Sequence, residues 1–248
     1  STSLERPPSL WGGHAEFLYL PPGATVHPMD KTLPAEVAVM FNPMGAGFAW
    51  GVDAPGLQPG QSIAILGPGQ RGLCAVIAAK EAGASFVVVT GLGRDEHKLA
   101  LARELGADMA IDVDAEDPVE LVKEATGGRG VDAVLDTTAY SVNPVAQGVR
   151  MLRERGTVVL AGLKGGRSLV DFSSDEIVTK QATIKGIMGV SIDAFQRAVE
   201  TIESRRYPLE KLHTHSFPVE ETDRAIRTLA GETSEPAVHV AIVPRRRD

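Results

Sequence analysis

Short apolar runs alternate with longer mixed segments through the middle of the chain. Six of the runs are long enough for strands, and they cover residues 62–66, 86–90, 109–111, 133–136, 157–161 and 183–187. Each run is apolar almost throughout, which is typical of strands whose two faces are both covered by helices. Strands that alternate with helices in this way predict an α/β fold built on a doubly wound parallel sheet.

Helix-start signals stand between the runs. Residues 117–120, Asp-Pro-Val-Glu, combine a capping residue, a proline at the first helical position and a capping-box carboxylate. Asn143-Pro144 repeats the first two of these signals, and residues 173–176, Ser-Ser-Asp-Glu, form a second capping box. Between Asp95 and Leu105 apolar residues recur at helical spacing, so one face of that helix is expected to lie on the sheet.

The two ends of the chain have a different pattern. Residues 11–22 contain a glycine turn and a partly alternating strand. The last part of the chain contains a strand, a helix over 220–230 that Gly231 closes, and a final strand over 237–243. Neither end has enough apolar residues for a core of its own. We expect the two ends to pack together as one split domain, with residues 193–205 as a helix that crosses between domains.

Composition and charge limit the classes of protein to which this chain can belong. A chain of 248 residues holds one large domain or two modest ones, and its 43% hydrophobic residues suffice for a core. The net charge of −7 argues against a nucleic-acid or anionic-membrane partner. No apolar run approaches the ~20 residues that span a membrane. The single cysteine excludes an internal disulfide, which fits a cytoplasmic location.

The first predicted strand leads directly into a glycine motif, G-x-G-x-x-G. Gly67 permits the tight turn, Gly69 leaves room for a pyrophosphate beside the backbone, and Gly72 lets the following helix pack closely. The helix N-terminus presents free N–H groups and the positive end of its dipole to the phosphates. This context favours dinucleotide binding over a merely structural glycine turn. The candidate cofactor-binding residues here are Gly67, Pro68, Gly69, Gln70, Arg71 and Gly72.

Two other segments end predicted strands at the carboxyl edge of the sheet, where ligands bind in open α/β folds. Thr137 and Thr138 follow the fourth strand and could contact a cofactor, although hydroxyls buried in a turn explain them equally well. Ala161, Gly162 and Leu163 follow the fifth strand. Their backbone is expected to run beside the nicotinamide.

The residues after the second strand bear on the choice between NAD and NADP. NAD-specific folds place an acid about 20 residues beyond the glycines, where it binds both ribose hydroxyls. Here Thr90 and Gly91 occupy that place and Arg94 follows. Gly91 leaves room for a 2′-phosphate that Arg94 could bind, which favours NADP over NAD. Asp95 and Glu96 weaken this preference, because they could cap the helix and pair with Arg94.

Together these segments make the chain resemble the medium-chain, zinc-type alcohol dehydrogenase family. The resemblance covers nearly the whole chain and is carried by residues 12–17, 66–72, 105–108, 130–136, 156–162 and 214–221. It implies a Rossmann nucleotide domain over residues 52–205, flanked by remnants of a split GroES-like β domain over residues 1–51 and 206–248. It also implies an NAD(P) cofactor, a small-molecule alcohol or carbonyl substrate, and a homodimer or homotetramer.

The resemblance further implies a segment that is missing from this chain. Members of the family begin well before Ser1, with a cysteine zinc ligand, a Gly-His-Glu segment and, in many cases, a four-cysteine zinc lobe. Asn42 lies near a third zinc-side position, and its amide is a poor zinc ligand. Cys74 is interpreted as a core residue. Zinc is therefore a cofactor of the family whose ligands we do not find here, and we expect a catalytically poor fragment without tightly bound zinc.

The histidines offer no clear catalytic group. His213 and His215 would share one face of a strand, as a metal-binding pair can. No nearby Cys, Asp or Glu completes a zinc-type site, so structural hydrogen bonding is the favoured interpretation. His14 follows the Gly-Gly turn, and His27 and His97 are expected at the surface. No catalytic residue is assigned.

Three functions fit the sequence. The first is hydride transfer between NAD(P) and an alcohol or carbonyl compound, for which zinc in this family polarises the oxygen. The second is a nucleotide-binding module without catalysis. The third is a zinc-independent quinone or enone reductase, in which positioning of the cofactor does most of the work. The motifs do not identify the substrate.

Overall fold

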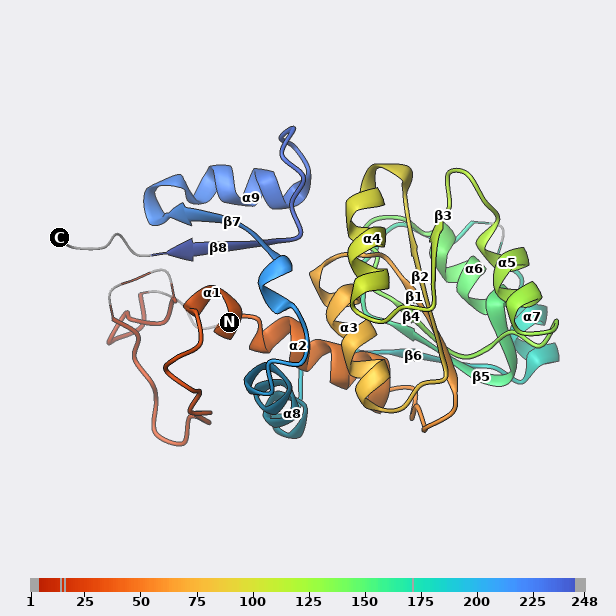
Figure 1. Ribbon diagram of the computed structural model, residues 1–248, viewed down its shortest axis with the longest axis horizontal. Helices are drawn as coiled ribbons and strands as arrows, with labels where there is room; N and C mark the ends of the chain where they lie inside the picture. Colours follow the sequence, from red (N-terminus) through yellow and green to blue (C-terminus); the bar gives the residue numbers. More distant parts are fainter. Residues whose placement is uncertain (1–4, 14, 16, 171, 244–248) are drawn as a thin grey trace.

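The larger body of the molecule is a six-stranded parallel sheet (Figure 1). The computed structural model describes residues 5–13, 15, 17–170 and 172–243. The strands follow one another across the sheet in the order β3-β2-β1-β4-β5-β6, and each pairs in parallel with its neighbours. They are β1 (Ser62–Leu66), β2 (Phe86–Gly91), β3 (Met109–Asp112), β4 (Val131–Asp136), β5 (Leu152–Leu160) and β6 (Thr183–Gly186). All six predicted strands are confirmed, and the sheet is doubly wound.

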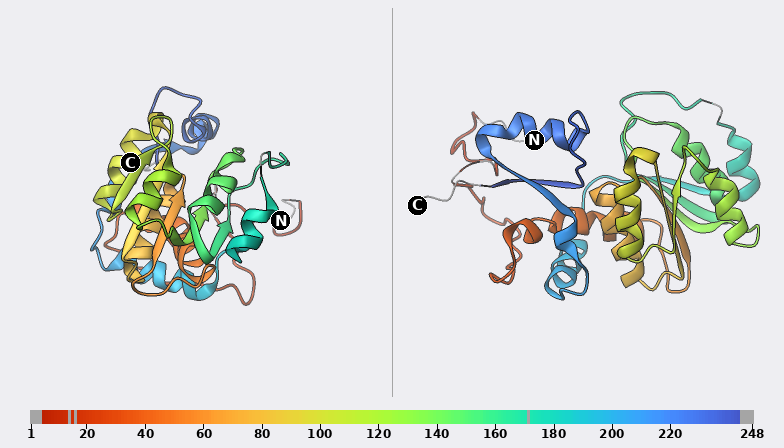
Figure 2. Two further views of the ribbon diagram at one scale, coloured as in Figure 1. Left: turned by 90° about the vertical axis from the view of Figure 1, so that its right-hand side faces the viewer. Right: turned by 45° about the horizontal axis from the view of Figure 1, so that its top comes forward.

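Helices cover both faces of this sheet, which explains why its central strands are apolar at most positions. On β1, Ile63 and Ile65 pack on one face, whereas Ala64 and Leu66 pack on the other. The first face carries α3 (Gln70–Glu81) and α4 (Glu96–Glu104). The second face carries α5 (Pro118–Ala125), α6 (Asn143–Met151) and α7 (Ser174–Lys180). Figures 1 and 2 show these two layers on opposite sides of the strands.

The helix-start signals are confirmed in two of three cases. Asp117 accepts hydrogen bonds from the backbone N–H groups of Val119 and Glu120, and Ser173 caps α7 in the same way. Asn143 is predicted to be an N-cap residue, and this is wrong, because the N-cap of α6 is Val142, one position earlier. Val142 has already entered the helical turn, with its carbonyl bonded to the N–H of Val145, so Asn143 is the first residue of α6.

A smaller body lies beside the sheet and is formed by the last part of the chain (Figure 1). Its strands β7 (His213–Pro218) and β8 (His239–Val243) are parallel, so the chain must cross over between them, and α9 (Thr222–Ala230) makes this crossover. Gly231 ends α9 in the left-handed region, with φ of 74°. Residues 220 and 221, predicted to be α-helical, lie instead in a short 3₁₀ turn, Val219–Glu221.

The strand predicted within residues 11–22 does not form in the described part of that segment. Its backbone is tied to the preceding residues at one point, where the N–H of Tyr19 donates to the carbonyl of Leu10. The rings of Trp11 and Tyr19 also meet edge to face. The alternating pattern was misleading because a strand also needs a partner strand beside it. In the described structure β7 and β8 pair with each other and not with this segment.

A helical layer joins the two bodies. It consists of α1 (Ala35–Ala38), α2 (Phe41–Phe48), a π-helical turn over Ala49–Asp53, and α8 (Ile192–Glu203), followed by the 3₁₀ turn Leu209–Lys211. Two glycines of α2, Gly45 and Gly47, allow this helix to pack closely on its neighbours. A Cβ on Gly47 would lie 2.7 Å from the carbonyl oxygen of Cys74 in α3, and one on Gly45 would lie 2.9 Å from the ring of Phe195 in α8. The helix predicted over residues 193–205 is thus found as α8, and it packs on α2.

Candidate nucleotide-binding site

The glycine loop between β1 and α3 has the geometry that its sequence predicts. Gly67 has φ of +102°, which favours glycine, and its N–H donates to the carbonyl of Thr90 in β2. A Cβ on Gly72 would lie 2.0 Å from the carbonyl oxygen of Gly67, so any side chain there would clash with the backbone. A Cβ on Gly69 would meet no atom within 4 Å. The loop therefore leaves open space beside Gly69, at the N-terminus of α3.

The segment that follows β4 packs directly on this loop, and the segment that follows β5 packs on the segment after β4. Thr137 donates its hydroxyl hydrogen bond to the carbonyls of Leu66 and Gly67. A Cβ on Gly162 would lie 2.0 Å from the carbonyl oxygen of Thr138, which explains the glycine at this position. Thr138 donates its hydroxyl to the carboxylate of Asp136. The structure thus brings these residues together with the glycine loop, and both threonine hydroxyls are engaged within the protein.

A buried ion pair lies under these segments, and it was not predicted from the sequence. Lys164 Nζ lies 2.7 Å from Oδ2 of Asp136, and the side chains are 13% and 0% exposed. The same ammonium donates to the carbonyl and the hydroxyl of Thr138, at 2.6 and 2.8 Å. The other carboxylate oxygen of Asp136 accepts from the backbone N–H of Thr138. The ammonium therefore joins the end of β4 to the segment after β5 by one ion pair and two hydrogen bonds.

The far end of the candidate site, beyond β2, differs in part from what the sequence predicts. The space at Gly91 is filled, because a Cβ there would lie 2.7 Å from the buried ring of Pro68. Asp95 forms its ion pair with Lys98 and not with Arg94. Arg94 is exposed and makes no ion pair within the described residues. Glycine at position 91 therefore follows from the packing of Pro68, and the suggested pairing of Asp95 with Arg94 is wrong.

Two carboxylates from the end of β3 also reach this region. Asp114 accepts a hydrogen bond from the backbone N–H of Gly93 at 2.9 Å. A Cβ on Gly93 would lie 3.0 Å from a carboxylate oxygen of Asp112. The sequence analysis missed both acids, because it looked for an acid only after β2. The register between β2 and β3 could have suggested Asp112, because Asp112 lies opposite Gly91 on the neighbouring strand.

A cavity of about 330 Å³ lies at the opposite end of the site. The π-helical turn places Trp50 at its wall, and the indole N–H donates to the carbonyl of Gly189 at 2.8 Å. The guanidinium of Arg71 lies over the Trp50 ring, 5.6 Å from its centroid. Asn42, Ala161 and Leu163 also line this cavity. The glycine loop, the end of β5 and the helical layer therefore enclose one space.

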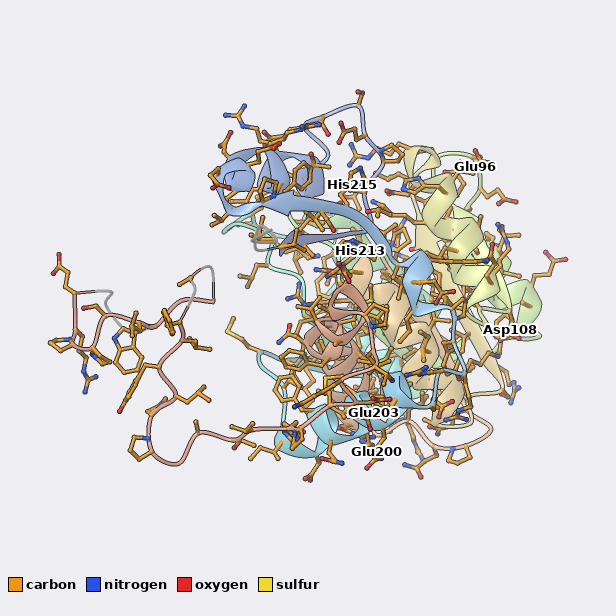
Figure 3. All side chains as sticks on the ribbon, turned by 60° about the vertical axis from the view of Figure 1, so that its left-hand side comes forward. Glu96, Asp108, Glu200, Glu203, His213 and His215 are labelled. Carbon is orange, nitrogen blue, oxygen red and sulfur yellow. The ribbon has the colours of Figure 1, made fainter. Side chains whose placement is uncertain are left out.

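Potential metal ligands are dispersed in the structure. Within residues 5–13, 15, 17–170 and 172–243, no three His, Cys, Asp or Glu side chains are grouped to hold a metal ion. Burial raises the pKa of the Cys74 thiol to about 12, which disfavours the thiolate that zinc requires. Figure 3 shows His213 and His215 on β7, far from Glu200 and Glu203 on α8. His14 lies outside the described residues. The groups in the described part of the chain do not fit a zinc site.

Two histidines of the smaller body, His213 and His239, serve hydrogen bonding. Nδ1 of His213 lies 3.2 Å from Nδ1 of His239 on β8, and its Nε2 lies 2.9 Å from the Ser216 hydroxyl. His215 faces Glu235 at 3.5 Å. Burial, and to a smaller extent His213, lowers the pKa of His239 to about 4, so this ring is neutral at pH 7. The predicted hydrogen bonding is found for His213, with His239 and Ser216 as partners that were not predicted, whereas Nδ1 of His215 is buried without a hydrogen-bond partner.

The site and the sheet together define a class of protein, the nucleotide-binding α/β folds. A glycine loop leads from a central strand to a helix N-terminus, at the point where the strand order reverses. More narrowly, residues 72–204 match the model of the zinc-binding dehydrogenase family, and the chain belongs to this family. No helix of the described residues is long and apolar enough to cross a membrane.

Individual relatives agree with this assignment. A probable alcohol dehydrogenase of Mycobacterium tuberculosis is 45% identical over 244 residues, which are 97% of this chain and 66% of that protein. An L-threonine 3-dehydrogenase of Bacillus velezensis is 32% identical over 86% of this chain and 60% of its own length. The crystal structure of an alcohol dehydrogenase from Thermotoga maritima superposes with a TM-score of 0.87 at 27% identity, covering 98% of this chain and 67% of the other. This chain thus spans 60–67% of the length of these relatives.

Proposed function

We propose that this chain is the nucleotide-binding part of an NAD(P)-dependent oxidoreductase that acts on an alcohol or a carbonyl compound. The observation that carries the proposal is the open space beside Gly69, at the N-terminus of α3 and at the switch point of the sheet. Relatives named as alcohol and threonine dehydrogenases support it. So does a zinc-binding dehydrogenase of Sinorhizobium meliloti, 26% identical, whose structure is described as bound to NADP.

The residues of this chain would bind and orient the cofactor. The free N–H groups of the first turn of α3 face the space beside Gly69 and would bind the pyrophosphate. The packed segments after β4 and β5 would form a fixed wall for the nicotinamide, because Thr138 and Gly162 are in contact. When bound, NAD(P) would supply the acceptor or donor of the hydride. Since the described residues hold no zinc site, we derive no step that passes through a metal.

Titration of the purified chain with NADPH and NADH tests this proposal. Trp50 lies at the wall of the cavity, so energy transfer from tryptophan to the reduced nicotinamide reports binding. We expect saturable binding of at least one of the two. If neither binds, the proposed function is wrong; binding without turnover on any alcohol or carbonyl compound would favour the module without catalysis. Turnover that chelators do not affect would favour the zinc-independent reductase.

We further propose a preference for NADP, carried by Arg94. Its exposed guanidinium has no competing carboxylate within salt-bridge distance in the described structure, and it follows β2 at the place where a 2′-phosphate would lie. A hydrogen bond to a charged group contributes about 1.5–3 kcal/mol, so Arg94→Ala should weaken NADPH binding roughly ten- to a hundredfold and leave NADH nearly unchanged. Fluorescence titration with both cofactors measures this.

The matched control is Arg129→Ala, which removes an exposed arginine near the amino ends of the strands and should change neither affinity. An equal loss for NADPH and NADH in Arg94→Ala would contradict the preference. The acids Asp112 and Asp114 would then be the candidates for binding the ribose hydroxyls.

The partner that we propose is a second copy of the chain, in a cytoplasmic homodimer or homotetramer. β6 is an edge strand that pairs only with β5 in the described structure, and Met188, just beyond it, is 82% exposed. An open apolar edge favours association, so pairing of two such edges would protect it. We expect light scattering at micromolar concentration to give a dimer or larger, and Met188→Glu to give more monomer. Val26→Glu, at an exposed residue of the N-terminal segment, is the control; a monomeric parent chain would contradict the proposal.

A further inference from the structure

The cavity beside Trp50 contains one charged side chain within an otherwise apolar wall. Its large apolar lining residues are Trp50, Leu163, Ile187, Met188, Val190 and Phe195. Asn42 and Arg71 are the polar side chains of the lining, and no acidic residue contributes to it. A space of this kind binds a carbon skeleton by its walls and fixes its orientation by a few polar groups. The position of Arg71 therefore decides which polar group the cavity would accept.

Arg71 is held in the cavity by an aromatic face and not by a counter-ion. It is the second residue of α3, and its guanidinium lies 5.6 Å from the centroid of the Trp50 ring. The hydrogen bond to Gly189 fixes that ring in turn. Cation–π contact orients a guanidinium and leaves its hydrogen-bond donors free. Arg71 makes no salt bridge among residues 5–13, 15, 17–170 and 172–243, whereas the nearby Lys164 is fully paired with Asp136 and Thr138.

The guanidinium of Arg71 is directed toward the substrate end of the candidate site. It contacts Trp50 of the helical layer, and the cavity that it lines is shared with the end of β5 and the segment after β6. The other end of the site is formed by Gly91, the last residue of β2, and by Arg94, which follows β2. A phosphate beside Gly69 would be bound by backbone N–H groups, which leaves the guanidinium available to a second anion.

We propose that Arg71 is a specificity-determining residue that binds a carboxylate of the substrate. The substrate class is then an alcohol or carbonyl compound in which an apolar or aromatic body carries a carboxylate. A planar guanidinium binds a carboxylate through two parallel hydrogen bonds. The inference rests on the proposed function, because it takes the cavity to be the place of the substrate beside the nicotinamide.

The test compares two probes, 4-carboxybenzaldehyde and its methyl ester, which differ in one negative charge. Each is titrated by calorimetry into the chain saturated with NADPH. We expect the carboxylate to bind at least tenfold more tightly than the ester. Arg71→Met should abolish this difference and Arg71→Lys should restore part of it; the affinity of each variant for NADPH is measured separately, so that the probes are always compared on the saturated chain. Arg129→Met serves as the control and should behave like the parent chain.

The outcomes separate the inference from the function on which it rests. If neither NADPH nor NADH binds the parent chain, the proposed function fails before Arg71 is tested; if only NADH binds, the probes are titrated into the chain saturated with NADH. If NADPH binds but the two probes bind equally, the proposal for Arg71 is overturned. If Arg71→Met weakens NADPH binding tenfold or more and does not change the ratio of the two probes, Arg71 binds the cofactor and the proposal is also overturned.

Discussion

Gly69→Val is expected to abolish dinucleotide binding and leave the protein folded. The backbone of Gly69 has φ of −69° and ψ of 172°, which any residue adopts, and a Cβ would meet no protein atom within 4 Å. The branched side chain would instead fill the space of the pyrophosphate. A loss of about 3 kcal/mol or more in binding free energy corresponds to a Kd raised roughly a hundredfold or more. Fluorescence titration measures the affinity, and thermal melting by circular dichroism measures the fold.

Gly12→Val is a matched control for this substitution. Gly12 also has open space around its Cβ position and no positive φ, but it lies far from the loop in the sequence, so cofactor affinity should not change. Gly72→Val makes the opposite comparison, because a side chain there would clash with the carbonyl of Gly67 and should destabilise the fold itself. Normal cofactor affinity in Gly69→Val would show that the glycine loop has only a structural role.

Lys164→Met is expected to lower the free energy of unfolding by about 3–5 kcal/mol, because it leaves the carboxylate of Asp136 buried without its counter-ion. Adding Asp136→Asn to Lys164→Met should recover part of this loss, since the amide carries no charge. Denaturation by urea, monitored by circular dichroism, measures both variants. Lys80→Met is the control, because its ion pair with Asp108 is partly exposed and should contribute less than about 1 kcal/mol. A loss below 1 kcal/mol in Lys164→Met would contradict the prediction.

The sheet and the glycine loop could be predicted because their sequence signals are local. The central strands β1, β2 and β4 are apolar at most positions, since α3 and α4 cover one face of the sheet and α5, α6 and α7 cover the other. Gly67 and Gly72 are required by backbone geometry within a few residues of each other. Asp117 caps a helix that begins at the next residue. In each case the physical cause lies inside the segment that carries the signal.

The features that could not be predicted depend on residues far apart in the sequence. Asp136 and Lys164 are each ordinary at their positions, and only the packing of two loop segments makes them a buried pair. Gly91 was interpreted as room for a phosphate, but the ring of Pro68 occupies that room. The alternating pattern after Trp11 predicts a strand, and the described residues there have no strand beside them.

The burial of Cys74 gives this chain a built-in reporter of local opening. The thiol is 1% exposed in α3, where the backbone of Gly47 packs on it, and burial raises its pKa to about 12. A thiol reagent therefore reacts only with molecules in which α3 has transiently separated from α2. Since the sequence has no other cysteine, the modification rate relative to that of the unfolded chain gives the equilibrium constant for this opening. The helix on which the glycine loop ends thus has a local stability that can be measured without any added label.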